Sequence, residues 1–103
     1  MDLLIKGRRA LVTGASLGIG RAAAEELARE GCDVAMVART EDTLRRAADN
    51  IARASGRRVL AVPADASVPE AITNAFQQAS EKLGGSIDIL VKNAPKTTFS
   101  SLA

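Results

Sequence analysis

The feature that most constrains this chain is a glycine-rich turn, Gly14-x-x-x-Gly18-x-Gly20, set between an apolar run and an alanine-rich run. The apolar run at residues 10–12 predicts a strand, and residues 21–30 have the composition of a helix. A strand that passes through such a turn into a helix brings free backbone N–H groups and the positive end of the helix together. The turn therefore predicts a binding site for a phosphate group.

Each glycine has its own role in this prediction. Gly14 lets the chain leave the strand sharply, Gly18 lets the backbone approach a pyrophosphate, and Gly20 lets the helix pack closely on the strand. The spacing differs from the Gly-x-Gly-x-x-Gly of the general dinucleotide fingerprint, and the Lys of phosphate-loop nucleotidases is missing after the last glycine. A dinucleotide is the first ligand to test. The alternative is a plain turn that starts a helix.

The rest of the chain alternates between apolar runs and segments with helical spacing. The runs predict strands at residues 8–13, 34–37, 58–62 and 87–91. Helices are predicted from about Gly18 to Glu30, from Glu41 to Ser55, and from the region of Pro69 to Leu83.

Two details of these helices are also predicted. The first helix is expected to bury a face formed by Ile19, Ala23 and Leu27. Ser67 and Glu70 have the spacing of a capping box at the start of the third helix.

Four strands separated by three helices predict parallel pairing, because each crossover returns the chain to the same end of the sheet. Right-handed crossovers then give a partial, doubly wound, Rossmann-like α/β fold (β-α-β-α-β-α-β) with strand order 3-2-1-4. The chain reverses its direction across the sheet beside the first strand, where the glycine turn lies. We expect residues 1–95 to form this incomplete NAD(P)-binding domain and residues 96–103 to form an irregular tail.

Composition argues against several other functions. Only 2% of the residues are aromatic, so stacking platforms for bases are lacking and we expect no nucleic-acid partner. The sequence has no His and one Cys, Cys32, which excludes an intramolecular disulfide and a Cys/His zinc site, and we expect no metal. Cys32 is expected to be a small buried residue. No stretch has the length of a membrane span and no signal peptide is recognisable, so we expect a cytoplasmic protein without a membrane partner.

The segment Thr13-Gly14-x-x-x-Gly18-Ile19-Gly20 resembles the cofactor motif of the short-chain dehydrogenase/reductase family. Residues 88–95, Asp-Ile-Leu-Val-Lys-Asn-Ala-Pro, are similar to that family's Asp-Ile-Leu-Val-Asn-Asn-Ala-Gly after the fourth strand. The resemblance implies an oxidoreductase that transfers a hydride between a nicotinamide cofactor and a carbonyl or alcohol. Lys92 and Pro95 depart from the pattern, so only Asn93 and Ala94 of this segment are carried over as cofactor-binding residues.

The end of the second strand predicts which dinucleotide is preferred. An acid there holds the ribose 2′-hydroxyl of NAD, whereas an Arg accommodates the 2′-phosphate of NADP. Ala38 and Arg39 occupy this place, so we expect NADP(H) to be favoured over NAD(H). The alternative is that Arg39 is an ordinary surface charge. Leu17 stands where the resemblance implies a basic residue, which predicts a modest preference.

Asp65, directly after the third strand, matches the acid that in this family contacts the adenine amino group, with the backbone of Ala66 beside it. The alternative is a loop acid near a helix start. The predicted cofactor-binding residues are therefore those of the turn and of the later loops, namely Gly14, Ser16, Leu17, Gly18, Ile19, Gly20, Arg39, Asp65, Ala66, Asn93 and Ala94.

The resemblance also implies catalytic groups that the sequence lacks. Family members use a Tyr-x-x-x-Lys pair and a Ser, whereas this chain contains no Tyr, and Ser100 and Ser101 follow the fourth strand too closely to be that Ser. We expect no catalytic residue. Two hypotheses follow: the chain is the cofactor-binding N-terminal half of such an oxidoreductase, cut before the catalytic residues, or a stand-alone module that binds a nucleotide or only associates with partners. In both, the apolar fourth strand at an uncovered edge predicts that the isolated chain self-associates or is only partly ordered.

Overall fold

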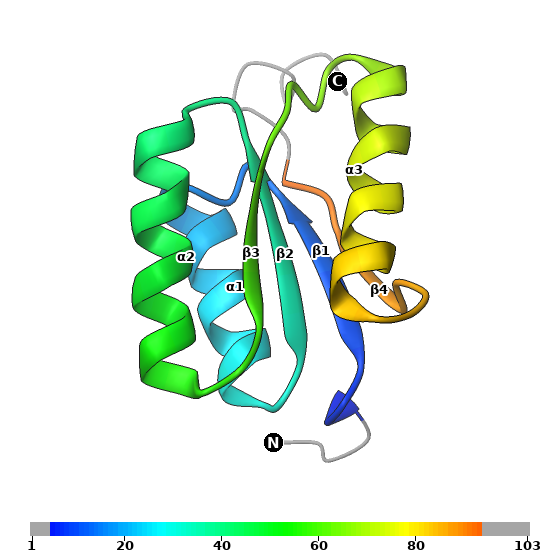
Figure 1. Ribbon diagram of the computed structural model, residues 1–103. Helices are drawn as coiled ribbons and strands as arrows, with labels where there is room; N and C mark the ends of the chain where they lie inside the picture. The colour runs from blue at the N-terminus through cyan, green and yellow to red at the C-terminus, as the bar shows by residue number, and fades with distance from the viewer. Residues whose placement is uncertain (1–4, 94–103) are drawn as a thin grey trace, which may run out of the picture.

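Four parallel strands form the centre of the protein, and helices cover both faces of the sheet (Figure 1). The computed structural model describes residues 5–93. Along the chain the elements are β1 (Arg9–Thr13), α1 (Gly18–Arg29), β2 (Asp33–Ala38), α2 (Glu41–Ser55), β3 (Val59–Pro63), α3 (Pro69–Leu83) and β4 (Ile89–Val91).

The strands lie in the order β3-β2-β1-β4, and each neighbouring pair is parallel. β1 is central, with Val12 opposite Met36 of β2 on one side and Val91 of β4 on the other. This order confirms the predicted Rossmann-like α/β fold, including the change of direction between β3 and β4. The loops after β1 and β4 therefore leave the sheet side by side at its carboxyl edge, the edge where the parallel strands end.

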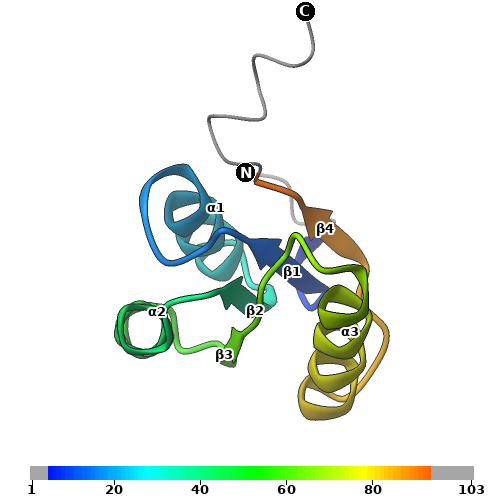
Figure 2. The same cartoon turned by 90° about the horizontal axis from the view of Figure 1, so that it is seen from above.

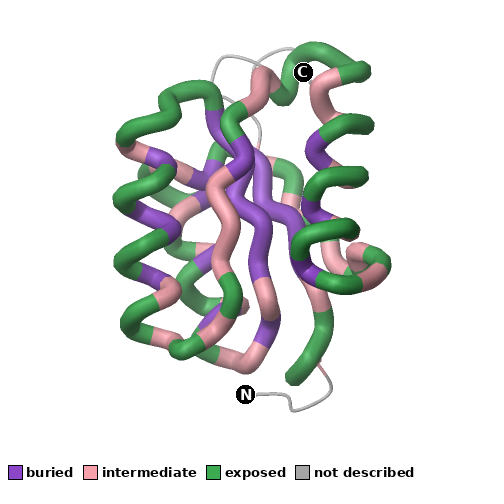
Figure 3. Tube along the Cα trace, viewed as in Figure 1, coloured by how far each residue is buried: buried purple, intermediate pink, exposed green. Residues whose placement is uncertain are grey.

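Two apolar clusters hold the helices on the sheet. α1 and α2 cover one face, over Val12, Val34 and Met36, whereas α3 covers the other, over Leu11 and Val37 (Figure 2). Because neighbouring residues of β1 and β2 point to opposite covered faces, both strands are apolar along most of their length. The buried residues accordingly concentrate along these central strands (Figure 3).

The buried face predicted for α1 is correct in part, and Ile19 does not belong to it. Its fully buried residues are Gly20, Ala24 and Ala28, and Ile19 is 78% exposed. Ala23 and Leu27, from the predicted face, are partly buried at the side of the cluster. The helix lies on the sheet through its smallest residues, which allow a close approach but give little hydrophobic signal in the sequence.

The capping box predicted at Ser67 and Glu70 is also wrong. The N-cap of α3 is Val68, which makes no side-chain capping hydrogen bond. The Ser67 hydroxyl instead donates a hydrogen bond to Oδ1 of Asp65 at 2.7 Å. Ser67 therefore belongs to the loop after β3 and not to the helix.

β4 begins at Ile89, two residues later than predicted, and Arg9 of β1 contacts the segment that joins α3 to β4. The Arg9 guanidinium donates to the carbonyl oxygens of Leu83 at 3.2 Å and Gly84 at 3.3 Å, at the C-terminal end of α3. Asp88 accepts a hydrogen bond from the backbone N–H of Arg9 at 3.1 Å. A cation at a helix C-terminus is favourable, and these contacts set β4 beside β1.

Cys32 is buried, as predicted, at the start of β2. Its thiol donates a hydrogen bond to the carbonyl oxygen of Ile5 at 3.3 Å, and burial raises the pKa of the thiol above its usual value. The side chain is therefore a packed, protonated thiol and not a reactive one.

Candidate cofactor site

The glycine turn joins the end of β1 to the first turn of α1. Gly14 and Gly18 have φ angles of 60° and 58°, in the left-handed region that favours glycine. A Cβ atom on Gly20 would overlap the carbonyl oxygen of Gly14, so the helix and the turn lie too close together for a side chain there. A Cβ atom on Gly18 would meet no protein atom within 4 Å, which means that the space beside this backbone is open.

The N-terminus of α1 lies at this open turn. Its N-cap residue, Leu17, has extended backbone and makes no side-chain capping hydrogen bond, and the first helical turn contains no acidic residue. Helix N–H groups that no side chain caps, together with the helix dipole, favour a bound anion. Leu17 and Ile19 are 68% and 78% exposed, whereas Ser16 is partly buried.

Asn93 links the end of β4 to the glycine turn through two hydrogen bonds. Its backbone N–H donates to the Thr13 hydroxyl at 3.0 Å, and its side-chain Nδ2 donates to the Gly14 carbonyl oxygen at 3.3 Å. Ala94, also predicted for the site, lies outside the described residues. Sequence analysis missed Thr13 as a partner of Asn93, because the contact forms only where β4 pairs with β1.

Arg39 and Asp65 follow neighbouring strands at the same carboxyl edge. In the pairing of β2 with β3, Ala38 lies opposite Pro63. The backbone N–H of Ala64 donates to the carbonyl oxygen of Ala38 at 2.9 Å, which continues the pairing past the end of both strands. The residues that come next, Arg39 and Asp65, therefore leave the sheet side by side.

Ser67 holds the Asp65 carboxylate in place. Oδ1 of Asp65 accepts hydrogen bonds from the Ser67 hydroxyl at 2.7 Å and from the Ser67 backbone N–H at 2.9 Å. These bonds, with a smaller contribution from the Arg39 charge, lower the pKa of Asp65 below its usual value. Asp65 is therefore an ionised hydrogen-bond acceptor at neutral pH. Ala66, between the two partners, is exposed.

A pocket of about 420 Å³ opens at the same edge, between the ends of β1 and β4 and the start of α3. Its lining includes Thr13, Ala66, Ser67, Ile72, Leu90 and Lys92. Thr13 at the end of β1 and the loop after β3 therefore line one cavity. Leu90, 51% exposed, supplies an apolar wall.

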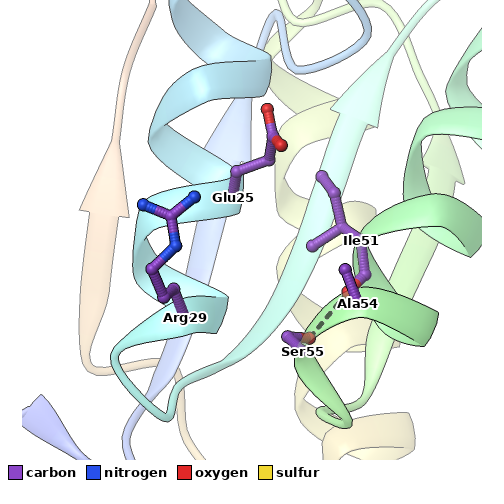
Figure 4. A pocket seen from close by; sticks show the side chains of 5 residues that line it. All are labelled: Glu25, Arg29, Ile51, Ala54 and Ser55. Atoms are coloured by element: carbon purple, nitrogen blue, oxygen red, sulfur yellow. Dashed lines mark hydrogen bonds between the residues drawn. The ribbon is translucent and has the colours of Figure 1, made fainter.

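A second pocket, of about 180 Å³, lies between α1 and α2, away from this edge (Figure 4). Its lining residues are Glu25, Arg29, Ile51, Ala54 and Ser55. The Ser55 hydroxyl donates to the Ile51 carbonyl oxygen at 2.7 Å, so this hydroxyl is bonded within its own helix. None of the predicted cofactor-binding residues lines the second pocket.

Metal binding and membrane spanning have no support in the part of the chain that the structure describes. Residues 5–93 contain no group of three or more His, Cys, Asp or Glu side chains arranged to hold a metal ion. In the same part of the chain, no helix is long and apolar enough to cross a bilayer.

Known proteins with similar sequences and structures are dehydrogenases and reductases. An uncharacterised oxidoreductase of Mycobacterium bovis is 40% identical over 100 residues, which cover 95% of this chain and 29% of the relative. A fatty acyl-CoA reductase of Mycobacterium tuberculosis is 38% identical over 99 residues, covering 96% of this chain and 33% of the relative.

Among solved structures, L-sorbose reductase from Gluconobacter frateurii, crystallised with NADPH and L-sorbose, superposes with a TM-score of 0.85 at 42% identity. The match covers 93% of this chain and 36% of the reductase, so the chain spans about a third of such relatives. The sequence profile described as short chain dehydrogenase matches residues 8–102. This chain belongs to the short-chain dehydrogenase family.

Proposed function

We propose that this chain is the NADP(H)-binding part of an oxidoreductase that interconverts carbonyl and alcohol groups. The observation that carries the proposal is the uncapped N-terminus of α1 beside the open backbone of Gly18. A pyrophosphate fits this place, because it needs backbone N–H donors, a favourable dipole and room for close approach. The turn is also fixed in position, since Asn93 bonds to Thr13 and Gly14.

The proposed cofactor lies along the carboxyl edge of the sheet. Gly14, Ser16, Leu17, Gly18, Ile19 and Gly20 would hold the pyrophosphate, and Asn93 with Ala94 would lie near a ribose. Arg39 would meet the 2′-phosphate, since it is exposed directly after β2. Asp65 would accept a hydrogen bond from the adenine amino group through the carboxylate oxygen that Ser67 leaves free, with the Ala66 backbone beside it.

The preference for NADP(H) rests on Arg39 and has support from a relative. A guanidinium attracts a phosphate with charge and a planar set of donors, whereas an acid at this place would repel it. L-sorbose reductase, 42% identical, was crystallised with NADPH. Leu17 offers no second cation at the turn, so the expected preference is modest.

A nicotinamide dinucleotide supplies or accepts the hydride of such a reaction when it is bound. The residues of this chain would bind and orient it, but the 103 residues contain no Tyr to exchange a proton with the substrate oxygen. General acid–base catalysis contributes about 10²- to 10⁴-fold to such reactions. We therefore propose that the chain by itself binds cofactor without turnover, and that the proton-transferring residues of the complete enzyme lie outside these residues.

The test is a titration of the purified chain with NADPH and with NADH, followed by nicotinamide fluorescence. We expect tighter binding of NADPH and a reversed or abolished preference in Arg39→Asp. Arg46→Asp makes the same change of charge on the exposed face of α2 and serves as the control. Equal affinities that Arg39→Asp does not alter would argue against the NADP(H) assignment, and no binding of either cofactor would favour the non-catalytic association module.

A further inference from the structure

We propose that Asp65 is a second determinant of cofactor preference, whose negative charge weakens the hold of Arg39 on a 2′-phosphate. This inference rests on the proposed NADP(H) function and concerns the same edge of the sheet. In this proposal Asp65 acts on the 2′-phosphate of the adenosine ribose, separately from any contact with adenine.

The first support is the position of the two side chains. The pairing of Ala38 with Pro63, continued by the hydrogen bond between Ala64 and Ala38, brings the chain segments before Arg39 and Asp65 to one place. Adjacent strands lie about 5 Å apart, so opposite charges on the next residues are within a Debye length of each other at physiological salt. A phosphate bound by Arg39 would therefore experience the Asp65 charge.

The second support is that the Asp65 carboxylate is held and ionised. Two hydrogen bonds from Ser67 to one carboxylate oxygen restrict its rotation, and they stabilise the charged form. A freely rotating carboxylate would turn away from an approaching phosphate, whereas this one is restrained. Asp65 therefore presents a lasting negative charge at the site.

The third support is the balance of other charges near Arg39. Glu41 and Asp42 lie in the first turn of α2, where the helix dipole offsets part of an acidic charge, and Glu41 also forms an ion pair with Arg45 at 2.8 Å. Asp65 bonds to a neutral Ser, so its charge has no such partner in its own loop. A phosphate monoester carries about −1.5 to −2 charges at neutral pH, so its attraction to Arg39 and its repulsion from Asp65 oppose each other.

The ratio of the two affinities separates this effect from other roles of Asp65. NADP and NAD carry the same adenine, so a lost base contact weakens both by the same factor. Partial unfolding of a variant also scales both apparent dissociation constants equally. Only an interaction with the group at the ribose 2′ position changes the ratio of the NADH dissociation constant to the NADPH dissociation constant, and the salt dependence separates the charge of the phosphate from a contact with the 2′-hydroxyl.

The test uses Asp65→Asn, which removes the charge and keeps an oxygen that accepts both Ser67 hydrogen bonds. We expect the ratio to rise about two- to tenfold at low salt, as neutralising one exposed charge near a phosphate predicts. The rise should shrink at about 1 M salt, where the Debye length is about 3 Å. Glu81→Gln makes the same change of charge near the far end of α3 and should leave the ratio unchanged.

The Asp65→Asn substitution is also tested in a chain that carries Arg39→Ala. There, Asp65→Asn should change the ratio less than in the wild-type chain, because without Arg39 the 2′-phosphate is no longer held close to Asp65. Asp65→Ser, a second variant that removes the charge, should act like Asp65→Asn, and it replaces that variant if the Asn chain does not fold.

The outcomes distinguish this inference from the proposed function. If the wild-type chain prefers NADPH but neutralising Asp65 leaves the ratio unchanged or lowers it, the inference is wrong and the proposed function stands. If neutralisation raises the ratio equally at low and high salt, a charge effect is also excluded. If the wild-type chain binds neither cofactor, the proposed function is wrong and the inference falls with it.

Discussion

The backbone N–H of Asn93 donates a hydrogen bond to the hydroxyl of Thr13 at 3.0 Å, which joins two positions 80 residues apart. This bond sets the end of β4 against the glycine turn that follows β1. The Asn93 side chain adds a bond to the Gly14 carbonyl oxygen. The candidate site is thus built by two segments that meet only in the folded chain.

Thr13→Val tests this bond. Val keeps the shape of the side chain but removes the acceptor, which leaves the Asn93 N–H without its partner. We expect the free energy of unfolding to fall by about 1–3 kcal/mol, measured by urea denaturation. Thr73→Val on the exposed surface of α3 is the control, with an expected change within about 0.5 kcal/mol. An equal, small effect of both substitutions would mean that the Thr13 bond contributes nothing to stability.

Gly18→Ala tests the open side of the turn. Gly18 and Gly56 both have positive φ, and a Cβ atom on either would meet no protein atom within 4 Å. Ala at either position is therefore expected to cost about 1 kcal/mol of stability through backbone strain alone. Only Gly18→Ala should also weaken NADPH binding, because Gly56 lies at the distant end of α2. Unchanged cofactor affinity in Gly18→Ala would contradict the placement of the pyrophosphate.

Arg9→Met tests how β4 is positioned. The substitution keeps an apolar stem and removes the donors to the carbonyl oxygens at the end of α3. We expect a loss of about 1–3 kcal/mol in the free energy of unfolding. Hydrogen exchange of the β4 amides should rise more than that of β2. Arg46→Met on the surface of α2 is the matched control, and comparable exchange in the two variants would show that Arg9 does not hold β4.

The lowered pKa of Asp65 predicts a dependence of stability on pH. Below about pH 4, the unfolded chain binds a proton at Asp65 more readily than the folded chain does, so folded stability falls as the pH falls through the folded pKa. Above that range the stabilisation is fully present. Ser67→Ala removes the main cause of the lowered pKa and should make the acid-side loss of stability less steep, as followed by urea denaturation at several pH values. An identical pH profile in the variant would contradict this role of Ser67.

Leu90→Lys tests the predicted self-association. β4 pairs only with β1 among the described strands. Leu90 lies on the same side of the sheet as α3, but its side chain is 51% exposed. A charge there should lower association of the 103-residue chain in sedimentation velocity, since exposed apolar strand edges recruit other chains. Leu17→Lys places the same charge at an exposed Leu beside α1 and should have no such effect. A wild-type chain that sediments as a monomer at all concentrations would refute the prediction.

The strand order was predictable because the signals for it are local. Each strand is a short apolar run, each helix is followed within two residues by a glycine, and the alternation itself requires parallel pairing. The errors in the buried face of α1 and in the capping box come from places where local pattern and packing differ. Ile19 has the hydrophobicity of a core residue, but Gly20 is the residue small enough to lie against the turn. Ser67 has capping-box spacing, but its hydroxyl donates a hydrogen bond to the Asp65 carboxylate in the loop before the helix.

The candidate site residues were predicted from motif positions, but their contacts were not. Nothing near Thr13 in the sequence indicates that Asn93 bonds to it, because that contact depends on β4 pairing with β1. In the same way, the nearness of Arg39 and Asp65 follows from the pairing of β2 with β3. The sequence indicates which residues have suitable chemistry, whereas the sheet determines which of them meet.

The central claim is that the glycine turn binds a dinucleotide, and backbone amide chemical shifts of the ¹⁵N-labelled chain during titration with NADPH test it most directly. The account predicts saturable shifts at Gly18, Ile19 and Gly20, with further shifts at Arg39. Little change is expected at Glu25 and Ser55, which line the pocket between α1 and α2. Shifts confined to that pocket, or none at all, would contradict the account.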